Sequence, residues 1–320
     1  MMVKMTNVKD KARGMFVGLA IGDALGAPVE FLDSSSILEN MDWIRKMEGG
    51  RRVLPKGVWT DDTSMALCIA DSILECGGYN SYDVMDKYID WEDNGYRSYF
   101  NGGYGIGLQT QLALSAYREN PKLTEEQKTD SAGNGVIMRL APTVIASLNA
   151  PNLRLASISA RDTHYSVVAE AVAEMFASAL YAAAQEKDID KIIKAVEADF
   201  TNPAYRKVYE DIKPLLERRN DRKGTSLKNL GGYCVDTLTI ALWGLQQFDR
   251  PLYGMLGVVS LGGDTDTNAA VYGQLAGAYY GYEALPKEWR ENVYLGNEIK
   301  DLADRLLAMK ECPIIKTRFE

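Results

Sequence analysis

Apolar residues recur at helical spacing in six stretches of this chain, and the two-residue alternation that marks β-strands is almost absent. The most regular stretch, residues 168–184, is rich in Ala, Glu, Met and Leu, with apolar positions every three or four residues. The same spacing predicts helices over 189–196, 237–245, 252–259, 269–280 and 299–309. Val, Ile and Thr seldom alternate with polar residues, so no central sheet is expected. The pattern therefore predicts an all-α fold.

Short breaks that contain glycine separate the predicted helices, at residues 49–50, 77–78, 102–103, 133–135, 231–232 and 262–263. None of these breaks is long enough for a flexible linker between domains, and no repeat period is present. A chain of 320 residues also has ample material for one large core. We therefore expect residues 1–320 to form a single compact domain of many short helices.

The net charge and the lack of membrane segments limit the partners that this protein is expected to have. A net charge of −8 without long runs of either sign disfavours nucleic acid or a membrane surface as a partner, because both attract basic faces. No stretch approaches transmembrane length. The apolar run 15–21 follows basic residues as in a signal peptide, but Asp23 interrupts it and no cleavage site stands out.

The four cysteines have no CxxC spacing and indicate reduced, mostly buried thiols, so we expect a cytoplasmic protein. Because the sequence has no coiled-coil signals, we also expect a monomer.

Two short acidic clusters, Thr60-Asp61-Asp62-Thr63 and Asp264-Thr265-Asp266-Thr267, each precede an apolar helical stretch. Crowded carboxylates repel one another unless positive charge lies between them, and hydroxyl oxygens beside them complete the oxygen ligand set that Mg²⁺ or Mn²⁺ prefers. Asp and Thr are also the usual residues at helix N-termini, so either cluster alone could be a cap. Both clusters carry more acids than capping requires. We therefore expect the fold to bring them together as a metal site.

Two loops are further candidates for ligand binding. Ser131-Ala132-Gly133-Asn134-Gly135 precedes an expected helix over 136–140, whose N-terminus would hold a phosphate, although Asn-Gly is also a common turn. Glu30 follows Pro28, which ends a helix; it is either a surface residue or a general base or metal ligand.

Two single residues have both a structural and a functional interpretation, and a third has a structural one. His164 is the only histidine, which excludes a histidine-rich zinc site, and no GxSxG motif accompanies it. It is either a packed or capping residue or a ligand contact. Tyr233 follows a glycine pair and either presents its ring to a ligand or packs in the core. Asp23, inside an apolar helix, is expected to accept structural hydrogen bonds.

Six segments between Gly18 and Gly281 together resemble the ADP-ribosylglycohydrolase family, all-α metal-dependent enzymes that include the dinitrogenase-reductase-activating glycohydrolases. The segments occur in the family's order: GLAIGDALGAPVEF, GVWTDDTSMAL, GNGVIMRLAP, the Thr163-His164 element, GGYCVDTLTIALW and SLGGDTDTNAAVYGQLAGAYYG. The pairing of TDDT with GGDTDTNAA is highly specific, and the other segments are individually weaker.

The resemblance implies a binuclear site for two divalent cations, Mg²⁺ or Mn²⁺, with Asp266 as the bridging ligand. The implied metal ligands are Thr60, Asp61, Asp62, Asp264, Asp266 and Thr267. The implied catalytic groups are Glu30, Asp62 and Asp266. The implied substrate contacts are Ser131, Gly133, Asn134 and Gly135 around the diphosphate, with His164, Tyr233 and Gly105 near the rest of the ADP-ribose.

The implied reaction is hydrolysis of the glycosidic bond between ADP-ribose and an acceptor. The acceptor would be a side chain of an ADP-ribosylated protein or part of a small ADP-ribosyl compound. Such cleavage passes through an oxocarbenium-like state that nearby carboxylates stabilise, and Glu30 or a metal-bound acid would take the proton of the water.

Gly105 departs from the family pattern. Relatives specific for arginine tend to carry an acid before an Ile-Gly pair, and here the segment reads Gly103-Tyr104-Gly105-Ile106-Gly107. The acceptor therefore stays open among arginine, serine, an ester and a small molecule. Gly105 also supports an alternative, a catalytically silent ADP-ribose-binding module. A phosphoesterase is less favoured, since the His- and Lys-rich surroundings usual for phosphoryl transfer are missing.

Overall fold

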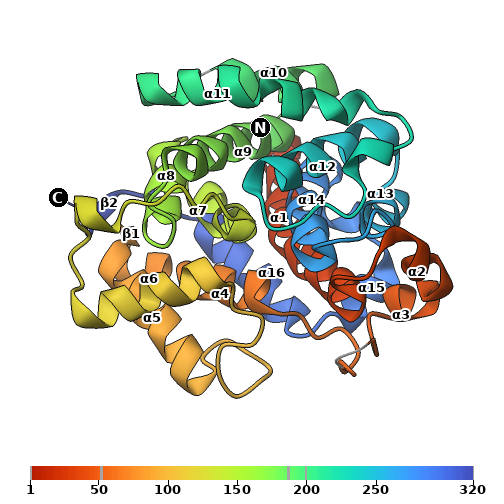
Figure 1. Cartoon of the computed structure of the whole chain (residues 1–320), viewed down its shortest axis with the longest axis horizontal. Coiled ribbons are helices and arrows are strands. Elements are labelled where there is room, and N and C mark those ends of the chain that lie inside the picture. The colour runs from red at the N-terminus through yellow and green to blue at the C-terminus, as the bar shows by residue number, and fades with distance from the viewer. Residues whose placement is uncertain (1, 51–52, 186–187, 199, 320) are drawn as a thin grey trace.

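The computed structural model describes residues 2–50, 53–185, 188–198 and 200–319, and it is built almost entirely of helices (Figure 1). The α-helices are α1 (Met2–Gly26), α2 (Ser34–Glu39), α3 (Met41–Lys46), α4 (Asp61–Cys76), α5 (Ser81–Asn94), α6 (Leu108–Glu119), α7 (Ala141–Ala146), α8 (Arg154–Arg161), α9 (Val167–Gln185), α10 (Ile189–Ala198), α11 (Pro203–Leu216), α12 (Cys234–Gln247), α13 (Pro251–Val259), α14 (Thr265–Tyr280), α15 (Lys287–Asn292) and α16 (Gly296–Leu307). Six 3-10 turns are η1 (Ala27–Val29), η2 (Glu125–Gln127), η3 (Asn134–Val136), η4 (Glu217–Asn220), η5 (Thr225–Leu227) and η6 (Tyr282–Ala284). Within the described ranges the only strands are β1 (Tyr79–Asn80) and β2 (Ile314–Lys316), which pair in parallel. The predicted all-α fold is confirmed.

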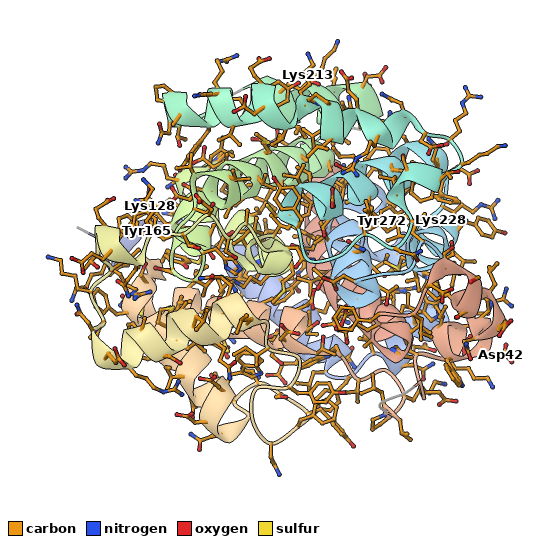
Figure 2. All side chains as sticks on the ribbon, in the orientation of Figure 1. Asp42, Lys128, Tyr165, Lys213, Lys228 and Tyr272 are labelled. Carbon is orange, nitrogen blue, oxygen red and sulfur yellow. The ribbon has the colours of Figure 1, made fainter. Side chains whose placement is uncertain are left out.

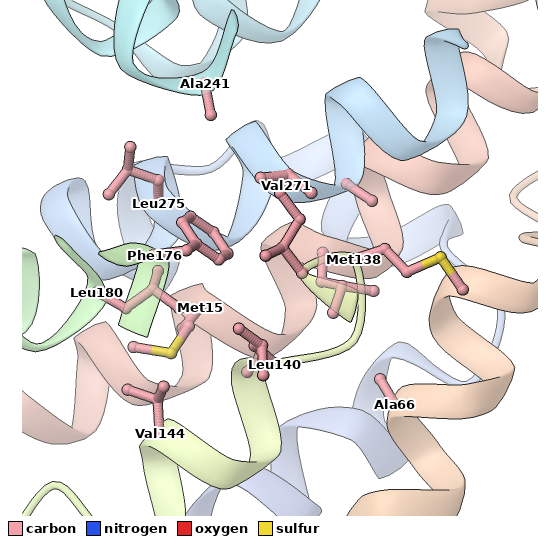
Figure 3. Packing of buried hydrophobic residues seen from close by; sticks show 14 of the residues in the cluster. Met15, Ala66, Met138, Leu140, Val144, Phe176, Leu180, Ala241, Val271 and Leu275 are labelled. Carbon is pink, nitrogen blue, oxygen red and sulfur yellow. The ribbon is translucent and has the colours of Figure 1, made fainter. Parts of the chain in front are cut away.

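The six helices predicted from apolar spacing are all present, as α9, α10, α12, α13, α14 and α16. Their apolar faces meet in one hydrophobic cluster that includes residues from α1, α4, α7, α9, α12 and α14. Figure 3 shows Met15 of α1, Phe176 and Leu180 of α9 and Val271 and Leu275 of α14 packed together in this core. Charged side chains such as Lys213 on α11 and Asp42 on α3 lie on the outside (Figure 2).

The central position of α9 corrects one expectation. Among the described residues, this helix is long and apolar enough to cross a membrane, with a mean hydropathy of 1.5 over a window of 18 residues within Val167–Gln185. The expectation that no stretch reaches that length is therefore wrong. In the structure 78% of this window is buried within the protein, because α8, α10, α11 and α14 pack around it. A helix surrounded by other helices needs no wide polar face, and the sequence of α9 is largely apolar, with buried Glu170 and Glu174 bonded to neighbouring segments.

The closest helix pair is α1 and α14, which lie side by side through the middle of the molecule (Figure 1). Glycines recur every fourth residue along α1, at Gly14, Gly18, Gly22 and Gly26, and so they share one face of the helix. A Cβ atom at Gly18 would lie 2.3 Å from the carbonyl oxygen of Gly273, and one at Gly22 would lie 2.0 Å from the carbonyl oxygen of Ala269. The two backbones are therefore in direct contact. The contact is antiparallel and brings the C-terminal end of α1 to the N-terminal end of α14.

We expect the substitution Gly18→Ala to destabilise the protein by about 1–3 kcal/mol, because the added methyl group forces the two helices apart. Urea unfolding of the variant measures this cost. Gly107→Ala is the matched control, since a Cβ atom there meets nothing within 4 Å and the backbone φ is −74°. Equal midpoints for the two variants would contradict the proposed backbone contact.

The prediction of a helix over residues 136–140 is wrong. The chain there forms η3 and a turn, and the α-helix begins only at Ala141. Pro142 follows immediately, and proline is tolerated only in the first turn of a helix. The buried side chain of Gln274 also accepts from the amide of Ala141 (2.9 Å) and donates to the carbonyl oxygens of residues 137 and 138 (3.0 and 2.7 Å), so those carbonyls bond across to α14.

Candidate functional site

Asp23 of α1 caps the N-terminus of α4 from outside that helix. Its Oδ1 accepts from the amide and the hydroxyl of Thr60 (both 2.9 Å), and its Oδ2 accepts from the amide and the hydroxyl of Thr63 (3.1 and 2.7 Å). The expected structural role of Asp23 is therefore confirmed. Because Asp23 supplies the cap, Asp61 and Asp62 in the first turn of α4 are not needed for capping.

The two acidic clusters meet at the end of the α1–α14 contact. The carboxylate oxygens of Asp23, Asp62 and Asp266 approach within 4.8 Å of one another, and so do those of Glu30, Asp264 and Asp266. Asp266 belongs to both groups. Asp264 stands at the N-cap of α14, yet its side chain makes no capping hydrogen bond. Capping thus does not account for these acids.

Asp264 is oriented by two loops that lie opposite α14. Its Oδ2 accepts from the side-chain amide of Asn134 (2.8 Å) and from the backbone amide of Gly232 (3.2 Å). Asn134 also donates to the hydroxyl of Thr237 (3.1 Å). The amide group of Asn134 therefore holds a predicted metal ligand, whereas the sequence assigned this residue to substrate contact.

A cavity of about 590 Å³ opens above the carboxylates. Ten residues singled out in the sequence line it: Glu30, Asp61, Gly105, Gly133, Asn134, Gly135, His164, Asp264, Asp266 and Thr267. Its volume suits a ligand of nucleotide size. None of the described residues that line the cavity is a lysine or an arginine.

Four of the predicted site residues do not line this cavity. Thr60 and Asp62 are buried beneath it, each 1% exposed. Ser131 lies at the start of the 131–135 loop, outside the lining. Tyr233 contributes its backbone, which forms a β-bridge with Gly133 and helps to hold that loop in place.

Several parts of the wall were not predicted as site residues from the sequence, among them Met138, Asn229 and the two segments described next. Residues 107–110, at the N-terminal end of α6, line the side next to Gly105, and Gly107 there signals a helix start. Phe31 stands at the cavity with a 65% exposed side chain and a left-handed backbone φ of +61°. Its position follows from the chain reversal after Pro28, where the Phe31 amide donates to the carbonyl oxygen of Gly263 (2.8 Å). No local pattern distinguishes such a residue from an ordinary loop phenylalanine.

Gly105 lies directly against Asp61. A Cβ atom on Gly105 would be 2.4 Å from Oδ1 of Asp61, and the backbone φ of +91° itself favours glycine. The loop as folded therefore has no room for an acidic side chain at position 105. The carboxylate of Asp61 takes the adjacent space.

Burial makes the ionised forms of these acids unfavourable unless a cation is present. Burial, followed by repulsion from Asp23, raises the pKa of Asp61 to about 8. Burial, together with the neighbouring carboxylates, raises the pKa values of Asp62 and Asp266 well above the usual range. Oδ1 of Asp62 is buried and accepts no hydrogen bond. A bare carboxylate oxygen among other carboxylates fits a bound divalent cation, whose positive charge would restore ionisation.

These pKa shifts predict the pH dependence of protein prepared with a chelator. An aspartate in the unfolded chain titrates near ~3.9, whereas Asp61 in the fold titrates at about 8. Between these values the folded state binds more protons than the unfolded state, so stability is highest at low pH and falls as the pH rises. Melting temperatures measured in EDTA from about pH 5 to about pH 8 should therefore fall, and Mn²⁺ should remove most of the fall. A melting temperature that rises with pH in EDTA would contradict the assignment.

Comparison with known proteins identifies the family. The ADP-ribosylglycohydrolase family profile matches residues 4–313. The ADP-ribosylarginine hydrolase Tri1 of Pseudomonas putida is 34% identical over 304 residues, covering 93% of this chain and 78% of that protein. The ADP-ribosyl-[dinitrogen reductase] glycohydrolase of Rhodospirillum rubrum is 29% identical, covering 95% of this chain and 97% of that one. A solved structure described as an ADP-ribosylglycohydrolase-related protein complex superposes with a TM-score of 0.77 at 35% identity, over 95% of this chain and 99% of that one. The chain therefore belongs to the ADP-ribosylglycohydrolase family, enzymes that hydrolyse the bond between ADP-ribose and an acceptor.

Proposed function

We propose that this enzyme removes ADP-ribose from arginine side chains of proteins and that it requires two divalent cations, Mg²⁺ or Mn²⁺. The observation that carries the proposal is the pair of carboxylate groups that share Asp266 beside a cavity of nucleotide size. Two groups with one common member suit two cations and a bridging ligand.

The proposed ligands of the cations are Thr60, Asp61, Asp62, Asp264, Asp266 and Thr267, with Glu30 close by. Thr60 donates its hydroxyl proton to Asp23, which leaves the lone pairs of its oxygen available to a cation. Bound divalent cations would supply Lewis acidity toward the ribose hydroxyls and an attacking water.

Glu30 is the proposed general base. Its side chain is only partly buried and lines the cavity. A carboxylate oxygen of Glu30 lies within 4.8 Å of a carboxylate oxygen of Asp264 and of one of Asp266. In the reaction the bond between the anomeric carbon and the acceptor nitrogen breaks, and the water oxygen bonds to that carbon. Glu30 takes one proton from the water and passes it to the departing guanidine nitrogen, so that ADP-ribose and an unmodified arginine side chain result and Glu30 returns to its ionised form. The surrounding carboxylates stabilise the positive charge that develops on the ribose.

Arginine is favoured as the acceptor by the relatives and by the charge of the cavity. A relative that is 34% identical is named an ADP-ribosylarginine hydrolase. Glu30 and Asp61 supply acidic groups to the wall, and no lysine or arginine of the described lining opposes a cationic acceptor. The 103–107 segment lacks the acid that arginine-specific relatives tend to carry at position 105. Asp61 lies beside Gly105 and places a carboxylate next to this segment.

Release of ADP-ribose from matched peptides tests the proposal. Peptides linked through arginine or through serine are incubated with the enzyme in Mg²⁺, in Mn²⁺ or in EDTA. We expect release from the arginine-linked peptide in either metal and none in EDTA, and mass spectrometry under native conditions should show two cations per chain.

The other outcomes separate the alternatives. Release from the serine-linked peptide alone would overturn the arginine assignment. Undiminished release in EDTA would overturn the metal requirement. Binding of ADP-ribose without release from either peptide would favour the catalytically silent module or a small ADP-ribosyl compound as substrate.

A further inference from the structure

Arg139 is a fully buried arginine that has no carboxylate partner among the ion pairs of the described residues. Its guanidinium donates to the hydroxyl of Thr163 (2.5 Å) and to the carbonyl oxygen of Ser159 (3.3 Å), and it lies 5.2 Å from the ring centre of Tyr88. Burying a charge without an ion pair is costly, so a role beyond packing is expected of this residue.

The proton on Thr163 connects Arg139 to the candidate site. A guanidinium only donates, so the Thr163 oxygen accepts from Arg139 and its own proton is directed elsewhere. The acceptor within reach is Nδ1 of His164, at 2.9 Å. A ring whose Nδ1 accepts a hydrogen bond carries its proton on Nε2 when it is neutral.

The Nε2 edge of the ring faces the 131–135 loop. His164 lines the cavity, and a Cβ atom on Gly133 would lie 2.7 Å from Nε2, which accounts for glycine at that position. The side chain of Gln109, which also lines the cavity, donates to the backbone carbonyl oxygen of Thr163 (3.1 Å). Burial, and after it the charge of Arg139, lowers the pKa of His164 to about 3, so the ring stays neutral near pH 7.

We propose that Arg139 and Thr163 are positioning residues that hold His164 as the neutral Nε2–H tautomer, a constant hydrogen-bond donor to a phosphate oxygen of the ligand. The identity of that phosphate as the ADP-ribose diphosphate rests on the function proposed above. The described lining of the cavity has no lysine or arginine to bind a diphosphate, and the proposed cations are directed to the ribose hydroxyls, so neutral N–H groups are the donors left for the diphosphate. A protonated histidine would instead be drawn to the carboxylates of the same cavity.

The single histidine makes the tautomer directly measurable, because protein labelled with ¹⁵N-histidine gives one imidazole spin system. We expect its two ¹⁵N shifts to report a protonated Nε2 and a bare, hydrogen-bonded Nδ1, unchanged between about pH 6 and about pH 8. A protonated Nδ1 or a charged ring in the native protein would overturn the proposal.

Substitutions at Thr163 test this relay of hydrogen bonds, from Arg139 through Thr163 to His164, without a measurement of turnover. Thr163→Val removes the donor to Nδ1, so we expect the fixed tautomer to be lost and the Kd for ADP-ribose to rise on the order of tenfold. Thr163→Ser keeps the hydroxyl and should restore both readouts. Thr239→Val is the matched control, since Thr239 is equally buried and its hydroxyl donates to the carbonyl oxygen of Val235 on α12, away from the cavity.

Arg139→Lys keeps the charge but not the planar guanidinium, and we expect the tautomer to change in this variant too. An unchanged tautomer together with an unchanged Kd in Thr163→Val would overturn the relay. If the tautomer and the ADP-ribose affinity behave as expected but no arginine-linked peptide is cleaved, the proposed acceptor fails and the relay stands.

Discussion

The substitution Asp266→Asn is expected to reduce turnover at least about 100-fold while raising the melting temperature of the chelated protein. Turnover falls because Asp266 is shared by both carboxylate groups, and an amide supplies a weaker, neutral ligand to each. Stability rises because burial and the neighbouring acids raise the pKa of Asp266 well above the usual range, so the charged form opposes folding near pH 7. Oδ1 of Asp266 accepts a hydrogen bond from the amide of Thr267 (2.9 Å), and the oxygen of asparagine can still accept it.

Peptide cleavage and thermal melting in EDTA measure the two parts of this prediction. Asp236→Asn is the control: Asp236 on α12 pairs with Arg218, outside the cavity, and its loss should leave cleavage unchanged. Normal cleavage by Asp266→Asn would remove the basis for a shared metal ligand. A fall in the chelated melting temperature would show that the charge of Asp266 is compensated within the fold.

The substitution Asp23→Asn is expected to have the opposite effect on stability, although it too replaces a buried acid with its amide in the same cluster. Asp23 accepts four hydrogen bonds, two on each oxygen. Asparagine offers one acceptor oxygen, and its NH₂ group would face the donors of Thr60 or Thr63. At least one backbone amide at the start of α4 would be left unpaired, at a cost of about 1–3 kcal/mol.

Urea unfolding tests this second prediction, and Mn²⁺ titration tests its consequence for the site. The affinity for Mn²⁺ should fall, because Asp23 positions Thr60 and the first turn of α4. Asp10→Asn, near the other end of the same helix, is the control, since Asp10 is partly exposed and accepts a bond of 3.2 Å from the amide of Glu283. An unfolding midpoint equal to that of the native protein would mean that the four bonds to Asp23 add no net stability.

The helices and the acidic clusters could be predicted because their signals are local. Apolar spacing predicts α9 and α14, and the crowding of carboxylates in both TDDT and DTDT, beyond what capping requires, indicates a cation. The meeting of the two clusters, by contrast, depends on the antiparallel contact of α1 with α14. That contact is visible in the sequence only as glycines spaced four apart, a pattern that does not name its partner helix.

The residues that the sequence placed least well are those whose partners lie far along the chain. The helix expected over 136–140 is absent because Gln274, more than 130 positions away, takes the carbonyl groups that a helix would have used. Asn134 lies in the predicted phosphate loop and lines the cavity, and no pattern in the sequence indicates that its side chain also orients Asp264. Thr60 and Asp264 occupy N-cap positions without capping side-chain bonds, because distant partners intervene: Asp23 on α1 caps α4, and Asn134 and Gly232 donate to the side chain of Asp264.

The glycine stripe of α1 limits how this enzyme could acquire a new substrate. Because main chain touches main chain along α1 and α14, the spacing between Asp23 on α1 and Asp266 on α14 is set by the two helix axes, and no side chain lies between the helices through which it could be adjusted. The loops that carry Phe31, Gly105 and residues 133–135 lie outside that contact and line the cavity, next to the start of α6. Divergence in acceptor preference among relatives is therefore expected to accumulate in these loops, over an invariant pair of helices.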